Sequence, residues 1–347
     1  MTFDSIVNSI PEWLKVEGPE SGMVISSRLR LARNIAGIPY AHRSDDEKLG
    51  EIIDNVLDTV HIAGFDSANF FRIDSLDELH KTVFIERHLI SPALAFKEGN
   101  CGVLVGEGEN NSILINEEDH LRLQVIKAGL NLDKAYQVID GMDNALEEDL
   151  DYAYHPRWGY LTACPTNVGT GIRCSVMMHL PGLVLSRQMQ RILAGVQELG
   201  LAVRGIQGEG SEVAGGIFQI SNQATLGVTE RETIETIERE TRKISRFEKE
   251  AREQLRRDSL ALVEDRVFRA LGTLKTARIL SSKEVTEHLS ALRFGIATEL
   301  VKGISFRDIN EMLICTRPAH IQKHVGKPLD SEERDIARAS LLRERLN

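Results

Sequence analysis

Short apolar runs dominate the pattern of hydrophobic and polar positions from the N-terminus to about Thr229. Each run is rich in Val, Ile or Leu and is bounded by turn residues, which is typical of strands. The pattern predicts strands at residues 102–105, 112–115, 175–180, 202–206 and 216–220.

One helix is predicted within this first part, over residues 187–199. Ser186 can cap its start and Gly200 can end it. Its apolar residues recur at helical spacing along one face: Met189, Ile192, Leu193, Val196 and Leu199.

From Thr229 onward the pattern is helical. Thr229 and Glu232 have the spacing of a capping box, and a long charged helix should follow to about Asp258. Its narrow apolar stripe is Ile234, Ile237, Ile244, Phe247, Ala251 and Leu255. Three later pairs mark further helix starts: Ser281 with Glu284, Ser305 with Asp308, and Asp330 with Glu333. We therefore expect an α+β domain followed by an all-helical one, with the boundary near residue 250.

Composition narrows the class of protein. The formal net charge is −10 and the hydrophobic fraction is 42%, which is typical of a globular protein and unfavourable for sequence-independent nucleic-acid binding. The four cysteines form no Cys-x-x-Cys pair, so neither a zinc ribbon nor a redox dithiol is indicated. The N-terminus does not resemble a signal peptide, and no apolar run is long enough for a membrane helix. We expect a cytoplasmic protein without nucleic-acid or membrane partners.

Two segments, residues 24–33 and 117–122, place arginines and acidic residues on or next to predicted strands. Arg28 and Arg30 alternate, so both point to one face of an extended segment at 24–33. Three acids at 117–119 follow an apolar strand and precede Arg122, an arrangement that can deliver a carboxylate into a cleft beside an arginine. Considered alone, each segment is more typical of a solvated strand face or turn.

Two glycine-rich segments add further candidates. Residues 164–173 place Gly169 and Gly171 where the backbone can approach a ligand, with Arg173 in reach of a phosphate. Residues 204–212 form a second glycine-rich loop, with Arg204 before it and Glu209 inside it. A histidine such as the one at 88 is more often a core or surface residue than a ligand contact.

No segment matches a Walker A loop or a protein-kinase glycine loop. Arginine is always charged and grips phosphate oxygens with a planar fork, so several together can hold a triphosphate without a P-loop. The arginines available for such a site are Arg28, Arg30, Arg122, Arg173 and Arg204.

Taken together, these segments resemble the phosphagen (ATP:guanido) kinases. That family's Ser-x-Arg-x-Arg, Asn-Glu-Glu-Asp-His-Leu-Arg, Cys-Pro-Thr-Asn-x-Gly-Thr-Gly-x-Arg and Arg-Gly-x-x-Gly-Glu motifs all occur here, in family order, across about residues 23–250. The resemblance implies an antiparallel sheet flanked by helices, with ATP and Mg²⁺ as cofactors. The metal would be held mainly by phosphates and water rather than by protein ligands.

The resemblance also implies roles for individual residues. Glu118 would be the catalytic carboxylate, Glu209 a second one, and Cys164 matches the family's reactive cysteine. The nucleotide would contact Ser26, Ser27, Arg28, Leu29, Arg30, His88, Arg122, Arg173, Cys174, Ser175, Val176, Met177, Arg204, Gly205, Ile206, Gln207, Gly208 and Glu209.

The arrangement of domains is similar to that of the bacterial protein arginine kinases. Only residues 1–22 precede the matched region, where members that act on free creatine or arginine carry a helical domain; residues 23–253 would form the catalytic domain and 254–347 a helical C-terminal domain. The helix near the C-terminus carries that group's Arg-Asp-x-x-Arg-Ala motif, which implies a regulatory phosphoarginine pocket at Arg334, Asp335, Ile336, Ala337, Arg338 and Ala339. From spacing alone, Arg334, Asp335 and Arg338 are more typical of a solvated helix face.

The chemistry explains why acids are needed beside the arginines. A guanidinium has a pKa above about 12, so one nitrogen must lose a proton before it attacks phosphorus. A carboxylate can take that proton while a second one orients the other nitrogens. We therefore expect a protein arginine kinase, with a kinase of a free guanidino metabolite and an inactive phosphoarginine-binding adaptor as alternatives. The resemblance further implies stress regulation, a Clp-type ATPase and a small zinc-binding activator as partners, and the apolar C-terminal helices suggest a homo-oligomer.

Overall fold

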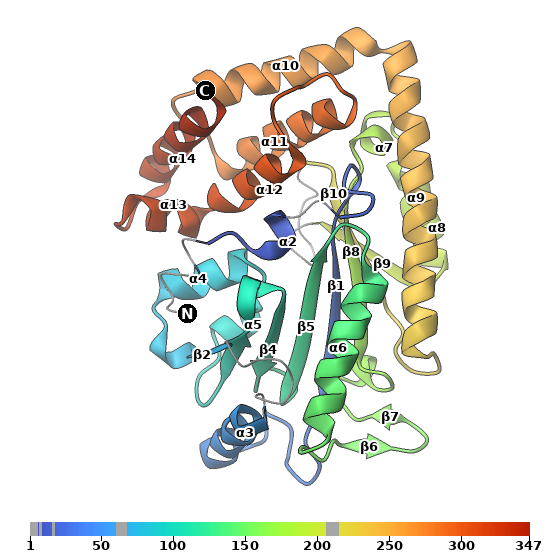
Figure 1. Cartoon of the computed structure of the whole chain (residues 1–347), viewed down its shortest axis with the longest axis vertical. Coiled ribbons are helices and arrows are strands. Elements are labelled where there is room, and N and C mark those ends of the chain that lie inside the picture. Colours follow the sequence, from blue (N-terminus) through green and yellow to red (C-terminus); the bar gives the residue numbers. More distant parts are fainter. Residues whose placement is uncertain (1–5, 7–8, 16–17, 60–67, 206–214) are drawn as a thin grey trace.

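The computed structural model describes residues 6, 9–15, 18–59, 68–205 and 215–347 (Figure 1). Its centre is an eight-stranded antiparallel sheet with the order β2-β3-β4-β5-β1-β8-β10-β9. The strands are β1 (Val24–Arg33), β2 (Asn69–Arg72), β3 (Gly102–Val105), β4 (Asn111–Ile115), β5 (Leu121–Ala128), β8 (Ile172–His179), β9 (Leu201–Gly205) and β10 (Ile217–Asn222). Two short strands, β6 (Tyr154–His155) and β7 (Gly159–Tyr160), pair separately. The predicted fold class is confirmed.

The two faces of the central strand β1 differ in chemistry. Leu29 and Leu31 are fully buried and face the long helices α6 (Leu132–Glu147) and α9 (Glu230–Asp258). Figure 1 shows both helices lying along the sheet. Because strand side chains alternate, Arg28 and Arg30 point to the other face. The remaining helices of this part are α2 (Glu12–Lys15), α3 (Asp46–Thr59), α4 (Glu78–Glu86), α5 (Pro92–Ala95), α7 (Pro181–Leu185) and α8 (Met189–Glu198).

The C-terminal part is helical, as predicted, and has its own core. Val267, Leu289, Phe294 and Leu342 are among its buried residues. Its helices are α10 (Leu260–Thr276), α11 (Ser282–Ala297), α12 (Phe306–Cys315), α13 (Pro318–Val325) and α14 (Ser331–Leu346). Capping boxes begin α9, α11, α12 and α14, with Thr229, Ser281, Ser305 and Asp330 as the caps. All four predicted helix starts are therefore confirmed.

The predicted start of the helix at 187–199 is wrong by two residues. Arg187 has a φ of 59°, a left-handed conformation that cannot belong to an α-helix, and Ser186 ends α7 instead of starting α8. Two residues assigned to apolar faces are also partly exposed: Leu199 at 49% and Phe247 at 37%. Leu199 lies just beyond the last turn of α8, so it does not share the buried face.

Several contacts join the helical C-terminal part to the part that holds the sheet. Ile314 of α12 joins Trp13 and Leu14 of α2 in one apolar cluster. Glu86 at the end of α4 accepts hydrogen bonds from the backbone N–H of Ala319 (2.9 Å) and from Nδ1 of His320 (2.7 Å). Elsewhere along the same boundary, His179 Nε2 lies 2.9 Å from Ser290 Oγ, and Arg293 donates to the Ser21 carbonyl. Within the described part of the chain, no helix is both long and apolar enough to span a membrane.

Candidate active site

Four arginines converge on one face of the sheet. In the ladder between β1 and β8, Arg30 lies opposite Arg173, and in the ladder between β1 and β5, Ala32 lies opposite Arg122. Residues opposite one another point to the same face, so these arginines join Arg28 there. We call the set Arg28, Arg30, Arg122 and Arg173 the arginine face. Arg204 lies two strands further on, opposite Gln219 of β10.

The arginine face holds more positive charge than its acids neutralise. Burial, followed by the nearby Arg173 and Arg122, lowers the pKa of Arg28 to about 10. The pKa of Arg30 is lowered well below its ordinary value by burial and by the three other arginines, with Glu117 acting in the opposite direction. The Arg30 Nε atom is buried without a hydrogen-bond partner among the described residues. A cluster of this kind suits an anion, because a phosphate chain would supply the missing acceptors.

Arg122 links the arginine face to the acidic segment. Its guanidinium forms ion pairs with Glu117, which is buried, and with Glu118 Oε2 at 3.1 Å. The Glu118 side chain is 46% exposed, so it is open to an incoming substrate. Glu118, the carboxylate that the family resemblance indicates as the base, therefore lies beside Arg122 at the edge of the cationic surface.

Asp119 fixes the acidic segment to the loop that carries Cys164. The Asp119 Oδ1 atom accepts hydrogen bonds from Asn34 Nδ2 and from the backbone N–H of Ala163, both at 2.7 Å. Asn34 in turn accepts a bond from the backbone N–H of His120 at 2.9 Å. Glu118 precedes Asp119 in the sequence, and Cys164 follows Ala163. The hydrogen bond between Asp119 and Ala163 therefore holds the segments that carry Glu118 and Cys164 next to one another. Cys164 itself is half-buried, with Sγ 3.0 Å from Thr166 Oγ1.

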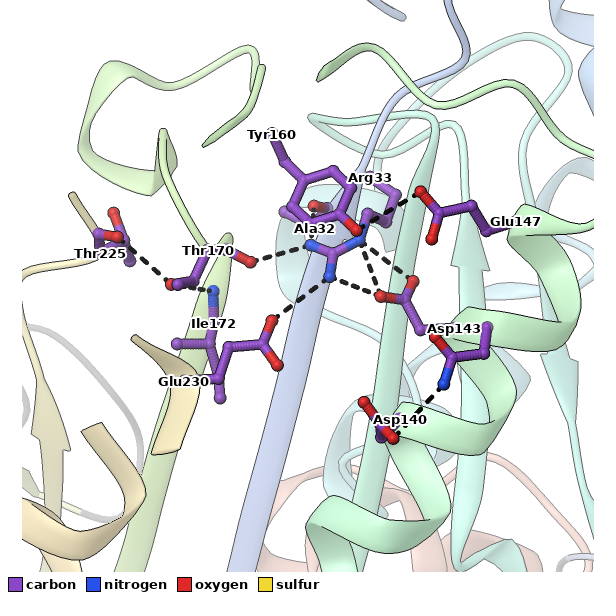
Figure 2. Close-up of polar contacts among 11 residues, drawn as sticks. Ala32, Arg33, Asp140, Asp143, Glu147, Tyr160, Thr170, Ile172, Thr225 and Glu230 are labelled. Atoms are coloured by element: carbon purple, nitrogen blue, oxygen red, sulfur yellow. Dashed lines mark hydrogen bonds and ion pairs between the residues drawn. The ribbon is translucent and has the colours of Figure 1, made fainter. Parts of the chain in front are cut away.

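Arg33 organises the glycine-rich loop from the opposite face of the sheet (Figure 2). Its guanidinium donates to both carboxylate oxygens of Asp143, at 3.1 and 3.0 Å from Nε, and to the Thr170 carbonyl at 2.9 Å. The Tyr160 ring packs against it, with the guanidinium carbon 3.6 Å from the ring centroid. Sequence reasoning missed this network. The available signal was that Arg33 is out of phase with Arg28 and Arg30, which places a charged residue on the core face.

His88 and Gln219 complete the end of the arginine face nearest α2. Arg28 Nη2 donates to Gln219 Oε1 at 3.1 Å. Burial, followed by Arg28, Arg317 and Arg30, lowers the pKa of His88 to about 3, so the imidazole is neutral at neutral pH. His88 has a φ of 60°, and its carbonyl accepts a bond from Gln124 Nε2 at 2.8 Å. His88 therefore lies beside Arg28, and its contact with the nucleotide stays a prediction.

Not every residue assigned to the nucleotide lies on the arginine face. Ser26, Ser175 and Met177 share it, because Ser175 lies opposite Arg28, Ser26 lies two residues before Arg28, and Met177 lies opposite Ser26. Leu29, Cys174 and Val176 are buried on the other face, in the main core, and Ser27 Oγ donates to the Gly129 carbonyl there at 2.7 Å. Gly205 ends β9, whereas Ile206, Gln207, Gly208 and Glu209 lie outside the described residues.

The Arg-Asp-x-x-Arg-Ala motif lies on α14, with its two arginines in different environments. Arg338 is 1% exposed and donates to the carbonyls of Thr316 (2.7 Å) and Leu280 (2.8 Å) while pairing with Asp335. Arg334 is half-buried, and Nη1 donates to the Leu329 carbonyl at 3.3 Å. Arg338 therefore holds helices together in this structure, and Ala339 is buried in the same core. Arg334, Asp335, Ile336 and Ala337 retain exposed surface.

Two family models cover most of the chain. Residues 48–251 match the catalytic domain described as "ATP:guanido phosphotransferase, C-terminal catalytic domain". Residues 261–347 match the "Protein-arginine kinase McsB C-terminal domain". The chain belongs to the ATP:guanido phosphotransferase family, in the branch that carries this C-terminal domain.

Relatives similar over the full length are protein-arginine kinases. The protein-arginine kinase of Halothermothrix orenii is 44% identical over 344 residues, covering 99% of this chain and 99% of the relative. That of Bacillus subtilis is 44% identical over 346 residues, covering 99% and 95%. Among solved structures, lombricine kinase has a TM-score of 0.58 at 24% identity, covering 71% of this chain and 76% of that one. The duplicated taurocyamine kinase of Schistosoma mansoni has a TM-score of 0.61 at 21% identity, covering 80% and 41%. These two structures share the fold.

Proposed function

We propose that this protein transfers the γ-phosphoryl group of ATP to the guanidinium of arginine side chains in proteins. The observation that carries the proposal is the arrangement of the arginine face, which is rich in positive charge and ends at Arg122 in contact with the exposed Glu118. The full-length similarity to protein-arginine kinases supports the choice of acceptor.

The residues divide the reaction into two parts. Arg28, Arg30, Arg122 and Arg173 would hold the triphosphate and stabilise the charge on the phosphoryl group as it moves. Glu118 would accept a proton from an acceptor nitrogen as that nitrogen attacks phosphorus. The new N–P bond forms while the bond between the γ-phosphorus and the bridging oxygen breaks, and ADP leaves with that oxygen. Glu209 and Cys164 are proposed to orient the other guanidinium nitrogens.

Mg²⁺ is proposed to enter with ATP. The described residues contain no group of three or more His, Cys, Asp or Glu side chains arranged to hold a metal. An ion that enters with ATP would be held mainly by phosphate oxygens and water. When bound, Mg²⁺ would neutralise charge on the β- and γ-phosphates, and the arginines would align the chain of phosphates.

The acceptor site is proposed to receive side chains of large substrates. Glu118 is exposed rather than enclosed, so a guanidinium attached to a protein can approach it. Mass spectrometry of an arginine-rich protein incubated with the enzyme and Mg·ATP tests this directly. The expected product is phosphoarginine on the protein. A parallel assay with free arginine should give much lower catalytic efficiency, and equal efficiency would favour the free-metabolite kinase. Absence of any phosphoryl transfer would favour the inactive adaptor.

Regulation and partners are proposed from the family resemblance. A phosphoarginine is proposed to bind at the α14 motif, where Arg334 and Asp335 retain exposed surface, and to change activity or assembly through coupling between two sites. Self-association is proposed through α10, whose Leu262 is 72% exposed and whose Phe268 is 49% exposed. A Clp-type ATPase, a small zinc-binding activator, a role in the stress response and a cytoplasmic location complete the proposal.

A further inference from the structure

A small pocket lies at the end of the arginine face that is furthest from Glu118. Trp13 of α2 lines it together with Ser26, Arg28, His88, Met177 and Gln219. The Trp13 and His88 rings are 6.1 Å apart between centroids, at 49° to one another. The pocket combines an aromatic wall and an apolar floor with one edge of the arginine face. Its volume of about 10 Å³ holds about one water molecule, so a base that reaches Trp13 must displace lining side chains.

The order of residues along β1 gives the site a direction. Ser26 lies opposite Met177, Arg28 lies opposite Ser175 and Ile126, and Arg30 lies opposite Arg173. Ala32, two residues further, lies opposite Arg122, which contacts Glu118. The six steps along β1 from Ser26 to Ala32 span roughly 20 Å at the rise of an extended strand.

A nucleotide has two chemically different ends, as does the series of residues from Ser26 to Ala32 along β1. It carries an apolar, planar base at one end and anionic phosphates at the other. Because Arg30, Arg122 and Glu118 lie toward the Ala32 end of this series, the phosphates should lie there and the base should lie at the Trp13 end. The neutral His88 imidazole adds no charge that would oppose a base there.

We propose that Trp13 forms the wall of the purine pocket, so that the short N-terminal helix α2 is part of the nucleotide site. This rests on the proposed use of ATP. Trp13 is 3% exposed, and its indole Nε1 is buried without a hydrogen-bond partner among the described residues. A buried indole N–H is usually bonded, so the purine or ribose would supply an acceptor that the free protein lacks.

The same residue connects the nucleotide to the helical domain. Trp13 packs in one apolar cluster with Leu14 of α2 and Ile314 of α12. Arg317, which follows α12, is close enough to His88 to lower the pKa of the imidazole. A base seated against Trp13 would therefore touch a residue that is also part of the interface between the two domains.

Tryptophan fluorescence can test the contact without disturbing it. The chain has two tryptophans, and the second, Trp158, is 42% exposed between β6 and β7. The W158F variant leaves Trp13 as the only indole emitter. Mg·ATP and Mg·ADP should change its emission, with a midpoint that equals the dissociation constant measured by calorimetry. Inorganic tripolyphosphate, which has no base, should compete with ATP for the arginines and leave the emission unchanged.

Substitution of Trp13 should weaken binding of nucleotides, which carry a base, and should leave binding of tripolyphosphate unchanged. W13L should weaken Mg·ADP binding roughly ten-fold, as expected when an aromatic partner of a base is lost. The same variant should bind tripolyphosphate as the wild type does, and W13F should lie between the two. If W13L does not fold, the W158F titration decides alone.

The outcomes separate this inference from the proposed function. If calorimetry detects no Mg·ATP binding to the W158F protein, ATP use itself is overturned, and this inference with it. If ATP binds while Trp13 emission stays constant, or if tripolyphosphate changes the emission equally, only the assignment of Trp13 is overturned. A saturating emission change with ATP and ADP alone supports it.

Discussion

Arg122 and Glu118 are in direct contact, with Nη2 of the arginine 3.1 Å from Oε2 of the glutamate. A residue proposed to hold phosphate and the residue proposed to remove the proton are therefore paired before any substrate is present. An incoming guanidinium would replace Arg122 as the partner of Glu118, since both cations bind a carboxylate through the same planar fork. Arg122 would keep its ion pair with Glu117 through Nη1, and its Nη2 would be available to the phosphate. The contact thus joins the acceptor half of the reaction to the donor half.

Arg30 should lower the stability of the free protein while it supports nucleotide binding. It is buried among three other arginines with an unpartnered Nε, so its charge is poorly compensated. Arg30→Met should raise the melting temperature of the nucleotide-free protein and weaken Mg·ATP binding at least ten-fold, the loss of a charged hydrogen bond of about 1.5–3 kcal/mol. Differential scanning fluorimetry and calorimetry measure the two effects. Arg43→Met, at an exposed arginine, is the control and should change neither.

The other arginines should affect nucleotide binding in the same direction. Single Ala substitutions at Arg28, Arg122, Arg173 or Arg204 each remove a charged partner of the phosphates and should lower both ATP affinity and rate. Calorimetry with Mg·ATP gives the affinities. Unchanged affinity in all four variants would contradict the proposed phosphate site.

His88 should make the protein less stable in mild acid. Its pKa is about 3 when folded and about 6.5 when unfolded, so the unfolded chain binds more protons between these values. The stabilising contribution is complete above pH 6.5 and is lost as the pH falls toward 3. His88→Asn removes the titration and suits the φ of 60°, since Asn tolerates left-handed backbone. Urea unfolding of both proteins should show a wild-type stability that falls more steeply with decreasing pH, by up to about 1.4 kcal/mol per pH unit. Parallel curves would contradict this role of His88.

Glu86 should hold the helical domain in place. It accepts bonds from Ala319 N and from His320 Nδ1, so Glu86→Ala leaves buried donors at the start of α13 without partners. We expect a loss of about 1–3 kcal/mol in the free energy of unfolding and faster hydrogen exchange in α13. Glu78→Ala, at an exposed position of the same helix α4, should leave both unchanged. Equal exchange in the two variants would show that the carboxylate does not join the domains.

The two arginines of the α14 motif should respond differently to substitution. Arg338→Ala removes a buried guanidinium with two carbonyl acceptors and an acidic partner, and should lower the melting temperature by several degrees. Arg334→Ala should leave the melting temperature nearly unchanged and abolish any effect of added phosphoarginine on activity or oligomer size. An unaltered phosphoarginine response in a folded Arg334→Ala protein would rule out this residue as the regulatory contact.

Sequence patterns predicted local structure well where a short-range cause acts. The capping pairs beginning at Thr229, Ser281, Ser305 and Asp330 all start helices, because a cap is decided by residues three positions apart. Alternation placed Arg28 and Arg30 on one face for the same reason. The strand β5 was not predicted as an element, although Arg122 near its start was singled out.

Contacts between residues far apart in the sequence could not be predicted from local patterns. Arg173 meets Arg30 through the register of β8 with β1, and Asn34 meets Asp119 across 85 residues of chain. The buried state of Arg338 likewise depends on carbonyls of Thr316 and Leu280, which no local pattern connects with α14. Trp13 gave no signal as a site residue, because its surroundings are assembled from four strands and a distant loop.

Phosphorylation of an arginine-rich protein by wild type, Glu118→Gln and Glu148→Gln tests the central claim most directly. Glu148 is an exposed glutamate at the end of α6 and serves as the matched control. With Mg·ATP, the wild type and Glu148→Gln should form phosphoarginine detectable by mass spectrometry. Glu118→Gln should form it at least about 100-fold more slowly, because the base is lost, while calorimetry shows unchanged Mg·ADP affinity. Phosphoarginine formation by Glu118→Gln at the wild-type rate would contradict the account.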